Sequence, residues 1–502
     1  MPSRLPPLRT VTVELHATEL DRGRADTLGA LFVALPDAAR TGGWPPFPYS
    51  DILQERYRAR VSGKPPVRFT SALPNTRGTH AGIAFLKPDA STFELLTVAR
   101  KLLAEAAGAR TAACLAAGLD ATLAARFADA MVAAALAQAF PLPDFRSRPE
   151  PAARIESLML FGFPPSTDLR RTEAAASGNN LARWLTTLPA NELTPAQYRA
   201  HIEELAGARG WQFEFFDEQR LKELGAGAFL AVARGSAERN AGIARLRRAP
   251  RGTASRHIAL VGKGVCFDTG GSNLKTAKGM FGMHGDMQGS AVALGTLLAL
   301  DELGAEFPAE CWLALVQNRI GPTAYTQNEV VTACNGTTIE VVHTDAEGRM
   351  ILADTLALAG RDRPALILDY ATLTGACVYA LGKLYSGAFT NRPELVPLLI
   401  EAGRTSGERV WPFPGDTDYD ELLESRIADV KQCLLDGEAD HILAARFLSR
   451  FVPEDVPWIH IDMSAGEQKD GLAHVPGEFT GFGVRLALDL LLDRDEIRQW
   501  IA

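Results

Sequence analysis

The stretch Leu260-Val-Gly-Lys-Gly-Val-Cys-Phe-Asp-Thr-Gly-Gly271 decides the fold of the second part of this 502-residue chain. It predicts an apolar strand that runs into a glycine-rich turn, as at the start of a βα unit. Open α/β sheets bind ligands at the carboxyl ends of their strands, so Lys263 and Asp268 are expected to emerge there. The glycines follow neither the GxGxxG pattern nor a pattern ending in GK[ST], which disfavours a nucleotide-binding loop.

Similar apolar runs recur on both sides of this stretch. Beyond it, runs of strand length alternate with helical stretches such as 289–303 and 441–451, which is typical of a mainly parallel sheet covered on both faces. Before it, β-type runs alternate with Ala-rich helical stretches at 96–107 and 123–139, as in an α/β layer structure. The expected strands are 10–15, 67–70, 82–86, 111–115, 157–161, 257–261, 311–316, 365–370 and 458–463. The predicted fold class is α/β with two domains, each a mixed or mainly parallel sheet flanked by helices.

Turn-forming residues suggest where the two domains divide. The run Gly162-Phe-Pro-Pro-Ser-Thr predicts a linker over 163–178. Residues 1–162 then form an N-terminal α/β domain, to which the sequence assigns no role. Residues 179–502 form the C-terminal domain, which carries the informative motifs.

Composition and charge exclude several classes of protein. The chain is 47% hydrophobic and 22% charged, with a formal net charge of −8, so it lacks the overall basic charge of a nucleic-acid-binding protein. No stretch of about 18 residues is free of charge, and the first residues lack the apolar core of a signal peptide. We therefore expect a cytoplasmic protein without a membrane partner. Its six cysteines are scattered, and we expect them to be reduced and mostly buried.

Acidic residues at the expected ends of elements form the most informative pattern. Asp286, Asp345 and Glu347 join Asp268 as carboxylates that the backbone can aim into one site. Each alone is more often a helix cap or a surface charge. Together with Lys263, Lys275 and Arg349, the four carboxylates suit a pair of divalent cations about 3.5–4 Å apart. Positive neighbours and burial lower the pKa of a lysine, so Lys263 is a candidate neutral amine ligand.

These residues lie in motifs that resemble the leucine aminopeptidase family, also called cytosol aminopeptidases. The resemblance covers roughly 180–485 and rests on several motifs in the same order. They are Leu193-Thr-Pro-Ala, Val261-Gly-Lys-Gly through Gly271, Gly285-Asp-Met, Thr344-Asp-Ala-Glu-Gly-Arg-Met, Ala371-Thr-Leu-Thr-Gly-Ala and Thr480-Gly-Phe-Gly-Val-Arg. An ordered series of this length is very specific.

The resemblance implies a two-metal exopeptidase that removes one residue from the free N-terminus of a peptide. Metal-bound hydroxide would attack the carbonyl while the substrate's α-amine binds one of the two manganese or zinc ions. Lys275 would polarise the scissile carbonyl, and Arg349, assisted by backbone around Leu373, would hold a bicarbonate that acts as general base. The implied metal ligands are Lys263, Asp268, Asp286, Asp345 and Glu347, of which Asp268 and Glu347 would bridge both ions.

The resemblance also implies a substrate pocket and an assembly. Met283 and Thr372 match positions that line the family's pocket for an apolar first side chain such as leucine, Ser464 is a further candidate, and Leu373 is also expected to contact substrate. The family forms a homohexamer of two stacked trimers and serves peptide turnover. Three features depart from its pattern: His343 stands where Asn is usual, His284 where Lys or Arg is usual, and the stretch 325–330 replaces the family's usual Arg-Pro-Gly-Asp turn. The changed residues leave open a preference for dipeptides of the cysteinylglycine type.

Two other functions remain as alternatives at this stage. Some bacterial relatives combine peptidase activity with DNA binding, so a DNA-binding or regulatory protein on an aminopeptidase scaffold is the main alternative. The Arg-rich pieces 245–248 and 146–148 are short, and such clusters are usually only solvated surface charges without a binding role. A two-metal hydrolase of phosphate esters is disfavoured because histidines at metal-ligand spacing are lacking.

Overall fold

The computed structural model describes residues 5–106, 108–148, 154–252, 254 and 256–501, in two compact units. The smaller unit consists of Pro6–Ala176 and Lys469–Glu478, and the larger unit holds Leu5, Ser177–Gln468 and the described residues from Phe479 onward. The segment Lys469–Glu478 thus groups with the smaller unit, although it lies within the range 179–502. The second half of the expected linker 163–178 is helical, because helix α5 (Arg170–Thr187) begins there.

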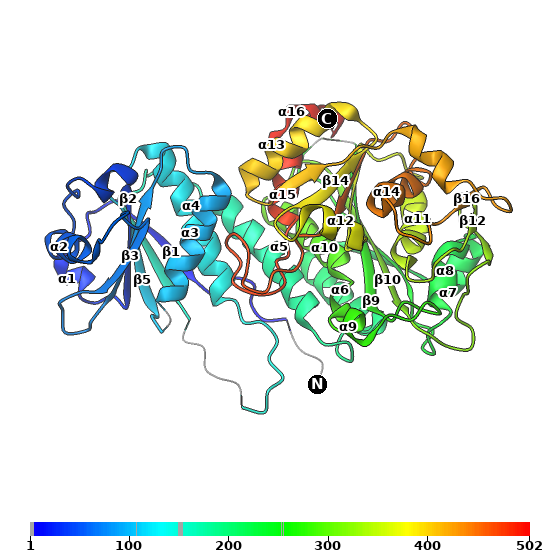
Figure 1. The fold of residues 1–502 in the computed structure, drawn as a ribbon, viewed down its shortest axis with the longest axis horizontal. Helices are drawn as coiled ribbons and strands as arrows, with labels where there is room; N and C mark the ends of the chain where they lie inside the picture. Colours follow the sequence, from blue (N-terminus) through cyan, green and yellow to red (C-terminus); the bar gives the residue numbers. More distant parts are fainter. Residues whose placement is uncertain (1–4, 107, 149–153, 253, 255, 502) are drawn as a thin grey trace. The chain divides into compact units, whose positions relative to one another are not determined.

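The smaller unit is built on a six-stranded sheet in the order β1-β6-β5-β2-β4-β3, in which only β3 is antiparallel to its neighbour. Helices α3 (Thr92–Glu105) and α4 (Ala121–Ala139) cover one face, and α1 (Arg22–Ala25) and α2 (Ser50–Arg60) lie on the other (Figure 1). The strands are β1 (Thr12–His16), β2 (Ala30–Pro36), β3 (Arg68–Ala72), β4 (His80–Leu86), β5 (Thr111–Ala116) and β6 (Ser157–Phe161). All five expected strands are present, and the apolar run of β2 adds a central sixth.

The larger unit is built on an eight-stranded sheet in the order β15-β14-β17-β13-β9-β10-β8-β7. Its centre is parallel, from β17 through β13 and β9 to β10, and antiparallel pairings lie toward both edges. The strands are β7 (Gln212–Asp217), β8 (Gly242–Arg248), β9 (Ile258–Asp268), β10 (Ala309–Asn318), β13 (Leu366–Ala371), β14 (Ser386–Thr390), β15 (Val410–Pro412) and β17 (Trp458–Asp462). A small sheet joins β11 (Val330–Thr332), β12 (Thr338–Glu340) and β16 (Val430–Lys431). The predicted fold class is confirmed.

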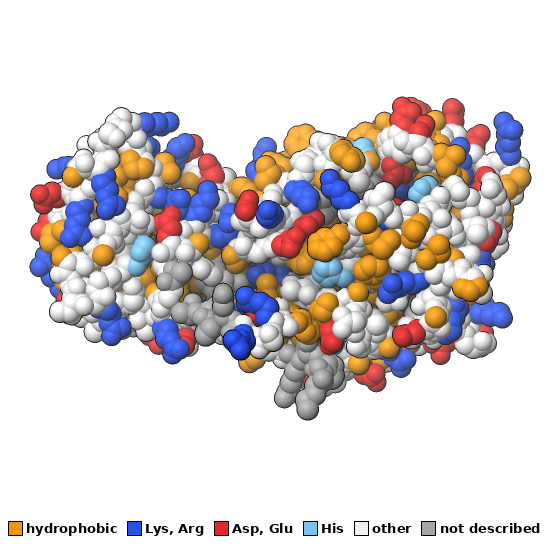
Figure 2. Space-filling model, turned by 60° about the horizontal axis from the view of Figure 1, so that its bottom comes forward, with side chains coloured by type: hydrophobic (Ala, Val, Ile, Leu, Met, Phe, Trp, Pro, Cys, Tyr) orange, Lys and Arg blue, Asp and Glu red, His pale blue; other side chains and the backbone are white. Residues whose placement is uncertain are grey.

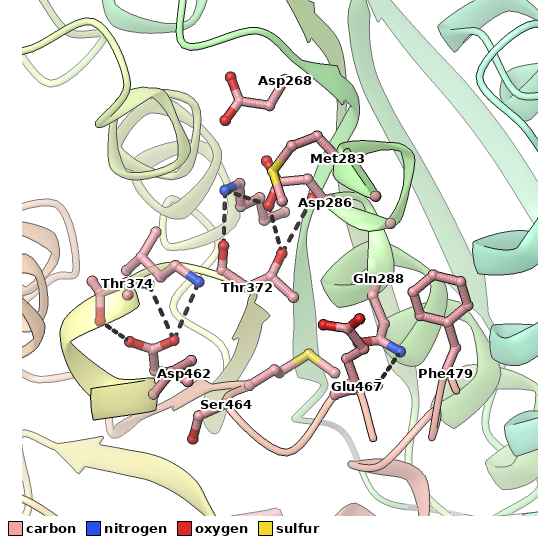
Figure 3. Close-up of a pocket in the computed structure, with 18 of the residues that line it drawn as sticks. Asp268, Met283, Asp286, Gln288, Thr372, Thr374, Asp462, Ser464, Glu467 and Phe479 are labelled. Carbon is pink, nitrogen blue, oxygen red and sulfur yellow. Dashed lines mark hydrogen bonds and ion pairs between the residues drawn. The ribbon is translucent and has the colours of Figure 1, made fainter. Parts of the chain in front are cut away.

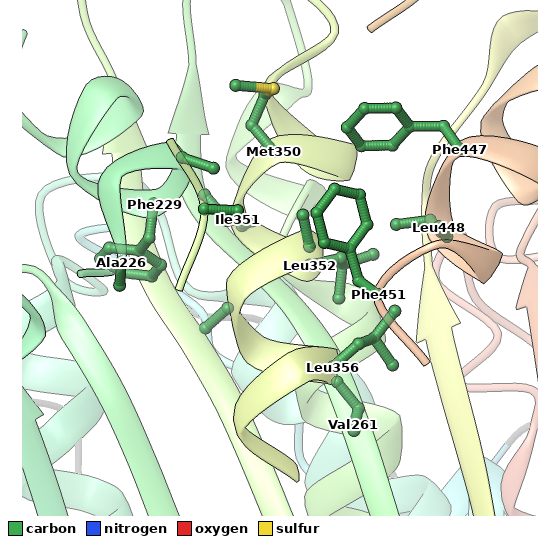
Figure 4. Packing of buried hydrophobic residues seen from close by; sticks show 14 of the residues in the cluster. Ala226, Phe229, Val261, Met350, Ile351, Leu352, Leu356, Phe447, Leu448 and Phe451 are labelled. Carbon is green, nitrogen blue, oxygen red and sulfur yellow. The ribbon is translucent and has the colours of Figure 1, made fainter. Parts of the chain in front are cut away.

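Helices cover both faces of the central sheet. On one face, α8 (Gly227–Ala233), α11 (Glu347–Ala359) and α14 (Asp440–Ser449) form a buried hydrophobic core with alternate residues of β9, including Val261 (Figure 4). On the other face, α10 (Gln288–Glu302) packs so closely that a Cβ added at Gly262 would lie 2.3 Å from the Cα of Ser290. Lys263 lies two residues after Val261 in the same strand, so its side chain points to the same face of the sheet, toward α11.

Strand β9 differs from the sequence expectation in its length. It runs through Gly262 and Gly264 as far as Asp268, so the expectation that Lys263 lies near the strand's carboxyl end is wrong. These glycines permit close packing: a Cβ at Gly264 would lie 2.6 Å from the carbonyl oxygen of Ala314. The turn forms only at Gly270 and Gly271, whose φ values of +85° and +63° favour glycine.

The cysteines and the buried arginines agree with the expectations drawn from the composition. All six cysteines are free and all except Cys334 are buried, as expected. Within the described part of the chain, no helix is long and apolar enough to cross a membrane. Arg245 and Arg248 are buried, the former against Glu310, so the piece 245–248 does not form a basic surface cluster. Basic, acidic and hydrophobic side chains are intermingled on the face shown in Figure 2.

Candidate active site

A cavity of about 330 Å³ in the larger unit opens where the parallel strands end. Asp268 is the last residue of β9, Thr372 follows β13, and Asp462 is the last residue of β17. Asp286 follows a short 3₁₀ turn before α10, and Glu347 opens α11. The carboxyl ends of neighbouring parallel strands and the starts of the helices that follow them therefore bring these side chains to one place.

Three buried carboxylates form the centre of the site. One oxygen from each of Asp268, Asp286 and Glu347 lies within 4.8 Å of the other two. The Lys263 ammonium lies 2.8 Å from Asp286 Oδ1 and 2.9 Å from Glu347 Oε1. It also donates a hydrogen bond to the carbonyl oxygen of Thr372 at 2.9 Å. Lys263 is therefore fixed from three sides.

A second ammonium lies between a second pair of carboxylates. Lys275 Nζ lies 2.9 Å from Asp268 Oδ2 and 2.6 Å from Asp345 Oδ1. Asn318 Nδ2 and the Gly270 N–H donate to Asp268 Oδ1 at 2.9 and 2.8 Å, which fixes the orientation of that carboxylate. The cluster thus holds four carboxylates against two ammonium groups and keeps an excess of negative charge.

Burial and mutual repulsion perturb these carboxylates. Burial and the neighbouring Glu347 and Asp268 raise the pKa of Asp286 to about 7, although Lys263 opposes the shift. Burial and Asp268 likewise raise the pKa of Asp345 to about 6. Burial alone would lower the pKa of Lys263, but the adjacent carboxylates outweigh it and raise the pKa. Lys263 is thus an ammonium in this arrangement, and it would become a neutral ligand only if added cations neutralised those carboxylates.

The donor set suits divalent cations. Asp286 Oδ2 and Glu347 Oε2 are buried and have no hydrogen-bond partner among the described residues. Buried carboxylate oxygens normally have partners, and leaving them unpaired costs free energy. Oxygen donors with one amine nitrogen suit ions such as manganese, magnesium or zinc. The residues present therefore fit a metal centre, and its ligands would be Lys263, Asp268, Asp286, Asp345 and Glu347.

The three residues expected to contact substrate all line the cavity: Met283, Thr372 and Leu373. The Thr372 hydroxyl donates to Asp286 Oδ1 at 2.7 Å, which connects the loop after β13 to the carboxylate cluster (Figure 3). Ser464 also lines the cavity. The structure thus brings the expected metal ligands, Lys275 and the expected pocket residues into one cavity.

Arg349 is not among the residues that line this cavity. Its side chain is buried and donates to the carbonyl oxygen of Gln432 at 3.0 Å and to Asp440 Oδ1 at 2.7 Å. Its Nε has no hydrogen-bond partner within the described part of the chain. A bicarbonate at Arg349 would accept from Nε or from an Nη hydrogen that is not bonded to Gln432 or Asp440, or would replace the Asp440 carboxylate.

The two histidines that depart from the family pattern lie close to the site. His343 Nδ1 accepts a hydrogen bond from the backbone N–H of Asp345 at 3.2 Å, and burial together with Lys275 lowers the pKa of His343. His284 packs edge-on against Phe479, and burial lowers its pKa although Glu467 opposes the shift. Both rings are therefore mainly neutral at neutral pH.

Sequence analysis missed Asp462, which organises the loop after β13. The carboxylate accepts hydrogen bonds from the Leu373 and Thr374 N–H groups at 3.2 and 3.3 Å and from the Thr374 hydroxyl at 2.6 Å. An aspartate at the end of an apolar strand was the available signal, the same one that identified Asp268. Asp462 holds in place the loop that contributes Thr372 to the cavity.

Comparison with known proteins agrees with this geometry. A model described as the cytosol aminopeptidase family, catalytic domain, matches residues 180–488. A probable cytosol aminopeptidase of Chlorobaculum tepidum is 42% identical over 314 residues, which span 62% of this chain and 62% of that relative. A mutant of tomato leucine aminopeptidase superposes with a TM-score of 0.84 at 28% identity and 97% coverage of both chains. The bottromycin maturation enzyme in complex with Mn superposes with a TM-score of 0.79 at 30% identity, and the match covers 92% of this chain and 98% of that chain.

The chain spans less than two thirds of the length of the first curated relatives, and the matched domain, the fold and the carboxylate cluster place it in a family described as aminopeptidases. The chain belongs to the cytosol aminopeptidase family.

Proposed function

We propose that this protein is a two-metal-dependent exopeptidase that releases N-terminal amino acids from peptides, with leucine or other apolar first residues preferred. The observation that carries the proposal is the buried cluster of Asp268, Asp286 and Glu347 in a cavity whose walls include Met283 and Phe479. The free α-amine of a peptide would bind one of the ions that these carboxylates hold, and the apolar walls would receive its first side chain.

The metal centre would be held by the five ligands named above, as manganese or zinc. Two bound divalent cations supply a water of lowered pKa and polarise the scissile carbonyl. Lys275 then has the role of an oxyanion donor. Its Nζ lies between Asp268 and Asp345, at the edge of the metal-ligand cluster, where a protonated Lys275 would donate a hydrogen bond to the carbonyl oxygen as negative charge develops.

Other parts of the site would position the substrate. Leu373 belongs to the loop held by Asp462, so its backbone has a defined place in the cavity wall. We propose that Arg349 holds a bicarbonate that accepts the proton from the attacking water. Support comes from the unpartnered Nε of Arg349 and from its place two residues after Glu347 in the first turn of α11.

Family membership supports a proposal about assembly and location. We propose that the protein is a homohexamer that acts in peptide turnover in the cytoplasm, where its six free cysteines would stay reduced. Sedimentation at micromolar concentration tests the hexamer, and a monomer would contradict it.

The test of the activity is hydrolysis of aminoacyl-p-nitroanilides and dipeptides by metal-stripped protein resupplied with manganese, zinc, cobalt or magnesium. Metal-dependent release of the first residue is expected, with Lys275→Ala reducing kcat by at least about 100-fold, the size typical of a lost oxyanion donor. Lys278→Ala, an exposed lysine in the same region, is the matched control and should match the wild type. No release with any metal would contradict the proposal.

A further inference from the structure

The cavity has a charged end that a purely apolar side-chain pocket would not need. Glu467 and Lys383 both line it and form an ion pair with Nζ 2.8 Å from Oε2. Figure 3 shows Glu467 beside Gln288 and Phe479, on the opposite side of the cavity from Asp268. The Glu467 carboxylate is thus separated from the metal-ligand cluster and belongs to the part that would receive a side chain.

The two partners of this ion pair differ in how firmly they are held. Glu467 pairs with Phe479 in an antiparallel bridge, and the carbonyl oxygen of the preceding Gly466 accepts hydrogen bonds from Gln288 at 3.0 Å and from the Thr480 N–H at 2.9 Å. Lys383 follows helix α12 (Gly375–Leu381) on a long, unbranched side chain. Both side chains are nearly half exposed, at 49% and 41%. Exposed ion pairs of this kind contribute little free energy, so Lys383 can leave at low cost.

The surroundings of Glu467 favour a cation over an anion. Lys383 forms an ion pair with Glu467 and so supplies a positive charge at this end of the cavity. The neighbouring walls are apolar, from Met283, Met463 and Phe479. Apolar walls ending at a fixed carboxylate match a long side chain with a hydrocarbon stem and a terminal cation.

We propose that Glu467 is a specificity-determining residue that admits peptides beginning with lysine or arginine beside those with apolar first residues, and disfavours peptides beginning with an acidic residue. The stem of the substrate side chain packs on Met283 and Phe479, and its cation replaces the Lys383 ammonium on Glu467. This inference rests on the proposed aminopeptidase function and names a substrate class for the same cavity.

The test compares kcat/KM for the p-nitroanilides of lysine, norleucine, glutamate and leucine, with manganese supplied. The readout is the lysine-to-norleucine ratio, because these side chains differ in charge but little in length. Glu467→Gln should lower this ratio about three- to tenfold, the range expected for a partly exposed ion pair. Lys383→Met should raise it, since Glu467 then has no competing ammonium. Glu424→Gln, an exposed glutamate outside the cavity lining, should leave the ratio unchanged.

The outcomes separate this inference from the proposed function. Hydrolysis of leucine p-nitroanilide with the same lysine-to-norleucine ratio in the wild type and both cavity variants would overturn the role of Glu467 and leave the aminopeptidase intact. Absence of hydrolysis of every substrate by the wild type would overturn the proposed function and this inference with it. Thermal unfolding of each variant identifies loss of fold, and the opposite directions expected for Glu467→Gln and Lys383→Met cannot arise from misfolding.

Discussion

Gly348 is the position where the smallest change should disturb the candidate metal centre. It lies in the first turn of α11, directly after Glu347, and faces Lys263 on β9. A Cβ added there would lie 2.7 Å from Lys263 Cε, 2.8 Å from Nζ and 2.9 Å from Cδ. Lys263 is only 3% exposed and is held by Asp286, Glu347 and the Thr372 carbonyl. In Gly348→Ala the added methyl group therefore meets a side chain that has little room to move.

Two opposing effects set the size of the stability change. Alanine is favoured over glycine inside a helix by about 1 kcal/mol. Overpacking a buried site costs about 1–3 kcal/mol. The expected net destabilisation is therefore about 0–2 kcal/mol, which leaves the protein folded.

The effect on activity should be much larger. To reach an ordinary van der Waals distance of 3.4 Å from 2.7 Å, Lys263 Cε must move by 3.4 − 2.7 = 0.7 Å, which pulls its amine away from Asp286 and Glu347. Misplacement of a catalytic group by about 1 Å costs on the order of 100-fold, so kcat/KM should fall by about 10- to 100-fold. The apparent affinity for the added metal should fall as well.

The assay is leucine p-nitroanilide hydrolysis across a manganese titration, together with thermal unfolding. Gly207→Ala is the matched control, because Gly207 is an exposed helical glycine in α6 (Pro195–Arg209) whose added Cβ would meet nothing within 4 Å. It should stabilise the protein slightly and leave kcat/KM unchanged. A Gly348→Ala protein with kcat/KM within twofold of the wild type would contradict the proposed role of Lys263.

Three further predictions concern pH, the loop after β13 and metal. Burial, only partly offset by the N–H groups of Leu486 and Gly483, raises the pKa of Glu408 from 4.5 to about 7. The folded state therefore binds this proton more tightly, and the resulting stabilisation is complete below about pH 4.5 and lost as the pH rises through 7. Urea unfolding at pH 5 and pH 7.5 should show that Glu408→Gln removes up to about 3 kcal/mol of this pH dependence, and an unchanged dependence would contradict the assignment. Asp462→Ala should lower kcat/KM at least tenfold and the free energy of unfolding by about 2–4 kcal/mol, because Thr374 and its loop lose their hydrogen-bond acceptor. Asp462→Asn should recover most of the stability. Equal losses in both variants would argue against the hydrogen-bonding role. Removal of metal with a chelator should lower Tm, and manganese should restore it in the wild type but not in Asp286→Asn; a Tm indifferent to metal would count against a bound ion.

The sequence by itself determined the α/β class and the residue types of the site. Strand and helix periods follow from local spacing, and acidic residues next to element ends are visible without a structure. Asp268, Asp286 and Glu347 were therefore found, and the structure brings them together because neighbouring parallel strands end at the same edge of the sheet. Lys263 was also found, although it was expected beyond the strand rather than inside it.

Only the tertiary structure decided which groups meet. Gly262 was read as part of a turn, but its missing Cβ serves the packing of α10, a helix that starts 26 residues later (288 − 262). The pairing of Arg349 with Asp440 and of Glu467 with Lys383 joins residues 91 and 84 positions apart in the chain. Propensity and periodicity describe each segment alone, whereas ion pairs, hydrogen-bond acceptors and cavity walls arise when segments pack. For this reason the sequence identified the metal-ligand chemistry, and the fold alone showed that a charged pair lines the same cavity.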